Sequence, residues 1–370
     1  MYVRAIMKKF AALFFPLFML VVFVGSIVYL SLRFGDIFNT GNALWFSTFS
    51  ATLIFMVAGL LVFNNTLKLS GSLVYRFAAL TMGYMLYLII CLILIDLINL
   101  FFPVPLEWMR ILTLSLPAGI LTIGLYKSFN IKVTPHQIKL SNYSNKLRVA
   151  HLSDIHIGHF RGKRFLQKLV NKVNKENPDV VVITGDFFDG KINLKDEALT
   201  PLKEIKVPIY FVNGNHDGYS GLQDVFAALA NTGVHNLRNE VIDVKGIQII
   251  GLNHMRPDPS TRDMHAATGP NMQDTLNTLQ IDKNKPSILL HHSPDGIQYA
   301  NEHGVDLYLS GHTHGGQQFP VTLLNEVLFT YNRGLNSYKN TKILVSEGIG
   351  TFGPPIRIGT KSEIVMIELA

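Results

Sequence analysis

Three apolar runs near the start of the chain limit what it can fold into. They cover Phe10–Leu32, Ala43–Phe63 and Phe77–Ile95, and none of them contains a charged side chain. A helix needs about 20 residues to cross a hydrocarbon core of ~30 Å. A surface helix of a soluble domain would show polar residues at every third or fourth position, and these runs do not. The runs therefore predict membrane-spanning helices.

A fourth run, Ile111–Tyr126, is shorter and contains Pro117. A spanning helix tolerates proline when neighbouring groups satisfy the freed carbonyl, and Trp108 suits the membrane interface. We expect a transmembrane helical domain over 1–127, with spans at about 10–32, 43–63, 77–95 and 109–126. A cleaved signal peptide is the alternative for the first run, because two lysines precede it, but the run is too long for the apolar part of such a peptide.

The basic residues that flank the runs predict the orientation in the membrane. One set of alternate segments carries Arg4, Lys8, Lys9, Lys68, Arg76, Lys127, Lys132 and Lys139, whereas the other set holds only Arg33 and Arg110. Basic residues collect on the cytoplasmic side. We therefore expect a multi-pass plasma (inner) membrane protein with both termini in the cytoplasm. This orientation requires an even number of spans; without the fourth, the C-terminal domain would face outward.

Charge and cysteine content narrow the function. The first 127 residues hold eight Lys/Arg and three Asp/Glu, and the remainder holds 25 and 23, so the net charge of +7 comes mainly from the flanks of the apolar runs. A nearly neutral remainder argues against a nucleic-acid groove, which needs clustered positive charge. Cys91 is the only cysteine, which excludes an intrachain disulfide and thiolate ligation of a metal in the C-terminal half.

Five short polar segments in the second half each follow an apolar, β-branched run. They read Asp154-Ile155-His156, Gly185-Asp186-Phe187-Phe188-Asp189, Gly214-Asn215-His216-Asp217, His291-His292-Ser293-Pro294 and Gly311-His312-Thr313-His314. Each run, such as Val180–Ile183, predicts a buried strand, so the polar groups lie at strand ends, where a rigid sheet can hold ligands in register. One such triplet occurs by chance, but five in this order indicate an enzyme site.

From residue 147 onward the pattern predicts a layered α/β domain. Strands are expected at 148–153, 179–184, 208–213, 247–252, 287–291, 305–310, 342–346 and 363–369, and helices near 163–176, 195–204, 221–231, 271–280 and 295–302. In this kind of alternation, ligands bind at the carboxyl ends of the strands. Residues 128–146, which include Pro135, are expected to form an extended linker between the membrane domain and the domain over 147–370.

The side chains of the polar segments suit the hydrolysis of a phosphodiester. This substrate is anionic and resists an anionic nucleophile; two divalent cations ~3.5–4 Å apart screen it, acidify a bridging water and stabilise the leaving oxygen. Two cations so close together require a bridging carboxylate, and Asp186, after the strand Val180–Thr184, is the natural candidate. Imidazole and oxygen donors favour Mn, Fe, Zn or Co over Ca or Mg.

The order of these motifs resembles that of the calcineurin-like metallophosphoesterase superfamily over Leu147–Ala370. Three stretches look like its bacterial membrane-tethered phosphodiesterase branch: Leu152–His156, Gly311–Gln317 and Val345–Thr351. The resemblance implies an αββα sandwich, here preceded by an all-α bundle of transmembrane helices. It also implies a metal-dependent phosphoric ester hydrolase with a binuclear metal centre.

Transferred by position, the resemblance implies a role for each polar residue. One metal would be held by Asp154, His156 and His314, and the other by Asn215, His292 and His312, with Asp186 shared. His216 would act as general acid or place a proton on the phosphoryl group, and Asp189 would orient its imidazole. His291 is expected on the opposite face of its strand, and Asp217 either supports the metal ligands or caps the following turn.

The loops around the site are expected to select the substrate. His159 and Arg161 follow the first motif, and His254 and Arg256 lie in the loop over 253–268. At least one arginine there should bind phosphate through two hydrogen bonds. Glu347 stands where related sequences often have a basic or amide residue, so it either adds an acid near the metals or faces solvent.

Attachment to a membrane predicts a phosphodiesterase or pyrophosphatase with a lipid-linked substrate, such as a nucleotide-activated glycolipid precursor or a phospholipid head group. The alternatives are a phosphodiesterase that acts on soluble nucleotides and a catalytically silent membrane sensor with the same fold. The chain keeps every ligand and the histidine beside the leaving group, which disfavours the sensor. Nucleic acid is not an expected partner.

Overall fold

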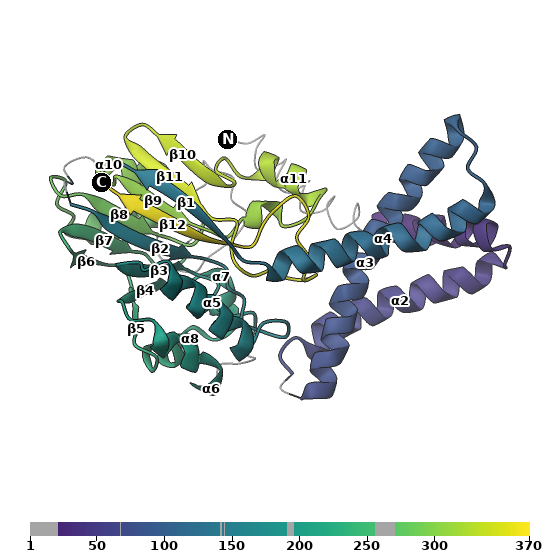
Figure 1. The fold of residues 1–370 in the computed structure, drawn as a ribbon, viewed down its shortest axis with the longest axis horizontal. Helices are drawn as coiled ribbons and strands as arrows, with labels where there is room; N and C mark the ends of the chain where they lie inside the picture. The colour runs from purple at the N-terminus through teal and green to yellow at the C-terminus, as the bar shows by residue number, and fades with distance from the viewer. Residues whose placement is uncertain (1–20, 67, 141–142, 144, 191–195, 256–270) are drawn as a thin grey trace. The chain divides into compact units, whose positions relative to one another are not determined.

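The computed structural model describes residues 21–370 except 67, 141–142, 144, 191–195 and 256–270 (Figure 1). The chain divides into two compact units. Unit 1 comprises the residues up to Phe63 and Leu73–Thr122, and unit 2 comprises Asn64–Ser72 and Ile123–Ala370. The segment Asn64–Ser72, which joins two apolar helices, therefore groups with the C-terminal domain.

Four helices in the described part of the chain are long and apolar enough to cross a membrane. They are Val21–Phe38, α2 (Asn42–Phe63), α3 (Leu69–Phe101) and α4 (Leu106–Phe129). Their positions agree with the expected spans, although α3 extends beyond the predicted 77–95 at both ends. The part of the first expected span before residue 21 lies outside the described residues.

Polar and small residues connect the helices of unit 1. Arg33 Nη2 lies 2.6 Å from Asp96 Oδ1, and the Tyr29 hydroxyl donates to Asp96 Oδ2 at 2.7 Å. A side chain at Gly59 would place its Cβ 2.6 Å from that of Ala78, so glycine allows α2 and α3 to approach closely. The aspartate at the end of the third span is therefore paired inside the helical unit.

Among the described residues, unit 2 contains two six-stranded sheets, ordered β1-β12-β2-β3-β4-β5 and β10-β11-β9-β8-β7-β6. The first sheet comprises β1 (Lys132–Ile138), β2 (Leu147–Leu152), β3 (Val180–Thr184), β4 (Ile209–Val212), β5 (Val234–Asn236) and β12 (Glu363–Leu369). The second comprises β6 (Glu240–Val244), β7 (Ile247–Gly251), β8 (Ser287–Leu290), β9 (Leu307–Ser310), β10 (Gly334–Tyr338) and β11 (Thr341–Val345). One apolar core joins the sheets, with Val149 and Val182 of the first packed with Ile249 and Leu290 of the second.

Helices cover the outer faces of both sheets. The first sheet carries α5 (Lys163–Lys175), α6 (Asp196–Leu199), η1 (Thr200–Glu204) and α8 (Leu222–Ala230), as Figure 1 shows. Leu166 and Leu169 of α5 pack there with Ala150 and Ile183. The second sheet carries α9 (Met272–Thr278) and α10 (Ile297–Glu302), which share a core with Ile250. This αββα arrangement confirms the predicted fold class.

The expected linker over 128–146 contains a strand. β1 pairs in parallel with β12 over its whole length, from Lys132↔Glu363 to Ile138↔Leu369, at the outer edge of the first sheet. Proline donates no backbone hydrogen bond, but an edge strand leaves one side of its backbone without a neighbouring strand, so Pro135 is tolerated there. The segment is therefore part of the sheet.

The topology brings the predicted polar segments together. β2, β3 and β4 are parallel neighbours in the first sheet, and β7, β8 and β9 are parallel neighbours in the second. Parallel neighbours end at the same edge of a sheet, and the two sheets are stacked. The five segments follow β2, β3, β4, β8 and β9 directly, so they meet at one end of the sandwich.

Candidate metal centre

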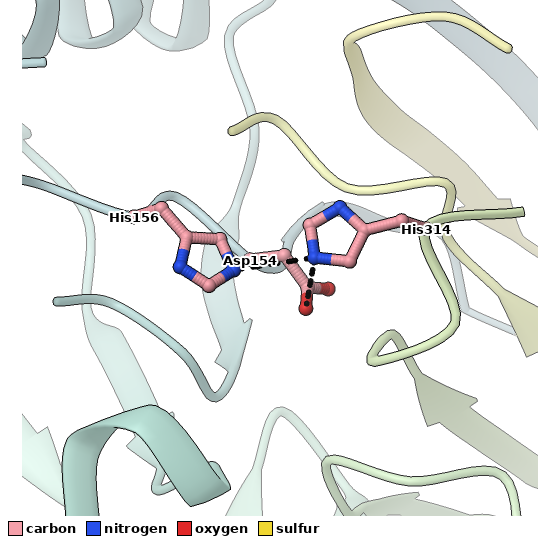
Figure 2. Close-up of side chains that lie close together, drawn as sticks. All are labelled: Asp154, His156 and His314. Atoms are coloured by element: carbon pink, nitrogen blue, oxygen red, sulfur yellow. Dashed lines mark hydrogen bonds and ion pairs between the residues drawn. The ribbon is translucent and has the colours of Figure 1, made fainter. Parts of the chain in front are cut away.

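The loops after β2 and β9 bring three donor side chains together. His156 Nε2 lies 3.2 Å from His314 Nε2, and His314 Nε2 lies 3.3 Å from Asp154 Oδ1. Figure 2 shows the three side chains together, with dashed lines that join the His314 ring to the His156 ring and to the Asp154 carboxylate. All three side chains are buried, and one donor atom from each lies within 4.8 Å of the others.

A second group forms around His292. Its Nε2 lies 3.1 Å from Asn215 Oδ1, 3.1 Å from His312 Nδ1 and 3.2 Å from Asp186 Oδ2. The Nδ1 of His292 bonds to the Thr184 carbonyl at 2.8 Å, which leaves Nε2 directed at the group. The loops after β3, β4, β8 and β9 each contribute one of these four donors.

Asp186 connects the two groups. Its Oδ2 also lies 3.9 Å from His156 Nε2, and its Oδ1 accepts a hydrogen bond from the backbone N–H of His216 at 2.8 Å. Burial alone would raise the pKa of Asp186, but His292 and His216 lower it well below its usual range. The side chain therefore stays ionised between the groups.

This donor set fits cations better than protons. A single proton on His292 Nε2 could form a hydrogen bond to only one of the three oxygen and nitrogen atoms that surround it. In the first group, His314 Nε2 lies within 3.3 Å of both an imidazole nitrogen of His156 and a carboxylate oxygen of Asp154, again with more lone pairs than protons. Imidazole nitrogen with carboxylate and amide oxygen is a donor set that suits divalent transition metals.

The ligand loops adopt a backbone conformation that the sequence does not reveal. Positive φ angles occur at Asp154 (52°), His156 (51°), Asp186 (51°), His312 (69°) and His314 (51°). Such angles are uncommon outside glycine, although Asp and His tolerate them better than most residues. Hydrogen bonds between the loops hold them, including Asp154 N–H to the Gly185 carbonyl at 3.0 Å. The five residues turn sharply enough to aim their side chains inward.

Two of the motif glycines leave room for the carboxylates. A Cβ at Gly311 would lie 2.1 Å from Asp154 Oδ2, and one at Gly214 would lie 2.1 Å from Asp186 Oδ1. Any side chain at these positions would displace an Asp carboxylate. Glycine is therefore required by the close approach of the ligands, in addition to the tight turn.

His216 and Asp189 form a pair at the edge of the centre. His216 Nδ1 lies 3.4 Å from Asp189 Oδ1, and the His216 ring meets the His156 ring edge to face at 4.8 Å between centroids. Burial lowers the pKa of His216, but Asp186 and Asp189 outweigh burial and raise this pKa to about 9. His216 therefore carries a proton at neutral pH in the metal-free protein.

Asp217 supports the ligand loops and does not face the centre. Its carboxylate accepts hydrogen bonds from the backbone N–H groups of Asp186, Phe187, Phe188 and Gly214 at 2.8 to 3.2 Å. The loop after β3 is thereby tied to the first turn of α7 (Asn215–Tyr219). The sequence left this role open between support and capping, and the contacts show both.

Two of the residues expected to bind substrate are engaged elsewhere. Arg161 is fully buried; it donates to Thr351 Oγ1 at 2.8 Å, and its guanidinium lies 5.0 Å from the centre of the Phe129 ring. His159 bonds to the Asn64 carbonyl at 2.8 Å and to Ser72 Oγ at 3.0 Å. These contacts give Arg161 and His159 partners within the fold, and their contact with a substrate stays a prediction.

The other expected substrate contacts have different outcomes. His254 lies beside the second group, with its ring centroid 5.7 Å from that of His292 and 6.3 Å from that of His312. Arg256 lies outside the described residues. Glu347 neither adds an acid to the centre nor faces solvent freely, because its Oε2 accepts the backbone N–H of Lys361 at 3.0 Å.

Phe352 and Arg357 border the centre and were not predicted from the sequence. The Phe352 ring lies 5.1 Å from the His314 ring, and Phe352 is 46% exposed. Arg357 is fully buried, with Nη2 3.3 Å from His314 Nδ1 and 2.7 Å from the Gly350 carbonyl. Both belong to the Gly-Pro-rich loop before β12, where no local pattern indicates burial. His291, expected on the opposite face of its strand, is buried, and its Nδ1 bonds to the Tyr308 hydroxyl at 3.0 Å.

Comparison with known proteins places this site in a family. The calcineurin-like phosphoesterase family model matches residues 147–316. An uncharacterized metallophosphoesterase of Helicobacter pylori is 35% identical over 255 residues, which cover 66% of each chain. One of Aquifex aeolicus is 32% identical over 235 residues, which cover 60% of this chain and 85% of the relative. A transmembrane protein with metallophosphoesterase domain from Danio rerio is 35% identical over 244 residues, which cover 62% of this chain and 55% of that protein.

The chain belongs to the calcineurin-like metallophosphoesterase family, a family of metal-dependent phosphoesterases, and this confirms the resemblance read from its motifs. The match spans just under two thirds of the length of the Helicobacter relative. The four apolar helices and the name of the Danio relative indicate membrane association.

Proposed function

We propose that this chain is a membrane-anchored hydrolase of phosphodiester or pyrophosphate bonds that uses two divalent metal ions. One observation carries the proposal. Donor side chains from five strand-end loops converge in two adjacent groups, and Asp186 lies at hydrogen-bond or ion-pair distance from histidines of both. A carboxylate in that position can neutralise part of the repulsion between two neighbouring cations.

In this proposal each group holds one ion. Asp154, His156 and His314 bind the first, Asn215, His292 and His312 bind the second, and Asp186 contacts both. Mn, Fe, Zn or Co suit these donors. Bound ions of this kind neutralise phosphoryl oxygens and acidify water.

His216 supplies the proton for the leaving oxygen. Its imidazole lies beside His156 and its Nδ1 faces the Asp189 carboxylate, so the ring can carry the proton that the leaving oxygen takes up. Asp189 fixes the ring through Nδ1. His254, beside the second group, contacts the substrate phosphate.

Contacts inside unit 2 support a site close to the bilayer and thus a lipid-linked substrate. Asn64–Ser72 runs directly from α2 into α3, and its ends bond to His159, three residues after His156. At the end of α4, Ser128 Oγ donates to the Pro355 carbonyl at 2.7 Å, three residues after Phe352. Residues at the ends of candidate membrane spans therefore hold two of the loops that border the metal centre.

The same contacts support the predicted four-span topology. Asn64–Ser72 and the C-terminal domain can touch only if they lie on one side of the membrane. That requires α3 and α4 either both to cross the membrane or both to remain on one side of it. The length and composition of both helices favour crossing.

The full chain, purified in detergent or nanodiscs, tests the reaction class with bis(p-nitrophenyl) phosphate and Mn²⁺. We expect hydrolysis, and we expect about a 10²-fold lower turnover for Asp186→Asn and for His216→Ala. Elemental analysis should show less bound metal in Asp186→Asn but not in His216→Ala. Both variants should remain folded by circular dichroism.

Inactivity of the wild-type chain with every divalent transition metal would contradict this proposal and favour the silent sensor. Lipid extracts assayed for phosphate release test the substrate class. Turnover of soluble cyclic nucleotides, with none of any lipid fraction, would favour the soluble alternative.

A further inference from the structure

The short helix α11 (Val321–Leu328) buries the polar side chains of Thr322 and Asn325 and exposes its apolar side chains. Thr322 and Asn325 face inward, and Asn325 Nδ2 donates to the Thr313 carbonyl at 3.1 Å. The outer side chains are Val321, Leu323, Leu324, Val327 and Leu328, and the exposed fraction reaches 63% at Leu324 and 81% at Val327. A helix on a water-facing surface has the opposite pattern.

The polar residues of α11 do not interrupt its apolar face. At 100° per residue, Leu323, Leu324 and Val327 fall on the side opposite Thr322 and Asn325, and Val321 and Leu328 continue the same apolar arc toward Asn325. Glu326 lies on the flank, where its carboxylate pairs with Arg333 at 3.3 Å. A continuous row of exposed Leu and Val marks a contact surface, whereas scattered apolar residues would need no explanation.

This face adjoins the metal centre at both of its ends. α11 follows η2 (His314–Gly316), and the residue after it, Phe329, packs its ring 5.8 Å from that of His312. Asn325 holds the carbonyl of Thr313, which lies between the two histidines of the last motif. Phe319, just before α11, and Phe352, whose ring lies 5.1 Å from that of His314, are also about half exposed.

We infer that the outer face of α11 contacts the lipid bilayer and holds the metal centre at the level of the head groups. The same chain carries four helices that fit a membrane, and span-end residues within unit 2 contact the loops around the same centre. A tethered domain meets the bilayer at high effective concentration, so a single turn or two of apolar side chains is enough for contact. A bilayer contact at α11 would bring lipid-linked substrates to the metal centre, and only this consequence rests on the proposed function.

Lipid-borne quenchers test this contact directly in the full chain. Cys91, the only cysteine, is first replaced by Cys91→Ala. Single cysteines are then introduced into this variant by Leu324→Cys, Val327→Cys and Glu326→Cys. Each is labelled with an environment-sensitive fluorophore in nanodiscs of phosphatidylethanolamine and phosphatidylglycerol. Leu335→Cys on β10, also an exposed apolar position, is the matched control.

We expect doxyl-labelled lipids to quench the probes at 324 and 327 at least about twofold more than the probes at 326 and 335, as for an interfacial helix. Equal quenching at all four positions, or none, would overturn the inference. Probes at 324 and 327 that are shielded from aqueous iodide but not quenched by lipid would also overturn it, because protein would then cover the face.

This readout needs no catalysis, so the two proposals can fail separately. If the chain hydrolyses no phosphoester but shows the quenching pattern, the proposed hydrolase is contradicted and the bilayer contact of α11 stands. If the chain is active but the α11 probes remain in water, the proposed hydrolase stands and the bilayer contact is contradicted. Wild-type turnover of bis(p-nitrophenyl) phosphate, measured in the same nanodiscs, completes the comparison.

Discussion

Histidines of the candidate metal centre differ in pKa although Asp186 and Asp189 raise the pKa of both His156 and His216. Burial lowers the pKa of each ring. At His156, burial and the neighbouring His216 lower the pKa to about 3, whereas at His216 two carboxylates outweigh burial and raise it to about 9. One kind of side chain can therefore serve as a neutral metal ligand in one position and as a proton donor a few ångströms away.

The Asp189–His216 pair leads to a prediction for the pH dependence of the proposed hydrolase. Asp189→Asn removes a negative charge next to the imidazole and so lowers the pKa of His216. The general acid must hold its proton, so activity declines as pH rises through that pKa. We expect the basic limb of the kcat/KM profile to move to lower pH and kcat/KM to fall by about 10–100-fold.

Asp189→Asn should bind as much metal as the wild-type chain, because Asp189 contacts His216 and is not among the proposed ligands. An unchanged basic limb, measured at saturating Mn²⁺, would show that Asp189 does not control the proton of His216. His216→Ala provides the reference profile, in which this limb is missing.

For single residues, the sequence predicted the chemical role of a side chain better than its position in the fold. The donor types and their order predicted the convergence at Asp186, because metal ligands must be specific atoms. Arg161 was different. A charged residue after a motif resembles a substrate contact, and only the packed structure shows its guanidinium buried and close to the rings of Phe129 and Phe165.

At the scale of secondary structure, runs of buried β-branched residues predicted eight strands with small shifts at their ends. Unpredicted strands in the described chain are β1, β5, β6 and β10, and all four are sheet-edge strands. Edge strands are half exposed and tolerate polar residues or proline, so their patterns are weak. The helix α11 was not predicted either, because its exposed face is apolar and its buried face polar.

β1 leads to a stability prediction at this scale. Ile138 is buried in the core between the sheets, whereas its neighbour Gln137 is exposed. We expect Ile138→Ala to lower the free energy of unfolding by about 2–5 kcal/mol. Gln137→Ala, the matched control on the same strand, should change it by less than about 0.5 kcal/mol.

Thermal or urea unfolding of the full chain in one detergent, followed through a C-terminal-domain signal, measures both variants. A cost for Ile138→Ala no larger than that of Gln137→Ala would mean that the segment behaves as a linker after all.

For the whole molecule, the contacts of Asn64–Ser72 in unit 2 allow a prediction of topology. Reporter fusions after Lys68, after Pro105 and after Ala370 sample the loop before α3, the loop before α4 and the C-terminal end. We expect green fluorescent protein to fluoresce at the first and third sites and alkaline phosphatase to be active only at the second, because positive residues favour the cytoplasmic side for the first and third.

The same reporter state after Pro105 and after Ala370 would show that α4 does not cross. Opposite states after Lys68 and after Ala370 would contradict the contact between Asn64 and His159. The first result would leave the metal centre unaffected, because no proposed ligand lies before Asp154.

The sequence by itself predicted the apolar helices, a layered α/β domain and the donor side chains at its strand ends, because length, alternation and donor chemistry are local properties. The sandwich of two sheets and the grouping of the proposed ligands followed from the resemblance to a known family. The tertiary structure alone decided which loops interlock, which histidines hold a proton, and which side of α11 faces outward. These depend on neighbours that are far apart in the chain. Asp186 and His292, separated by more than a hundred residues, set each other's ionisation only because two stacked sheets end at the same place.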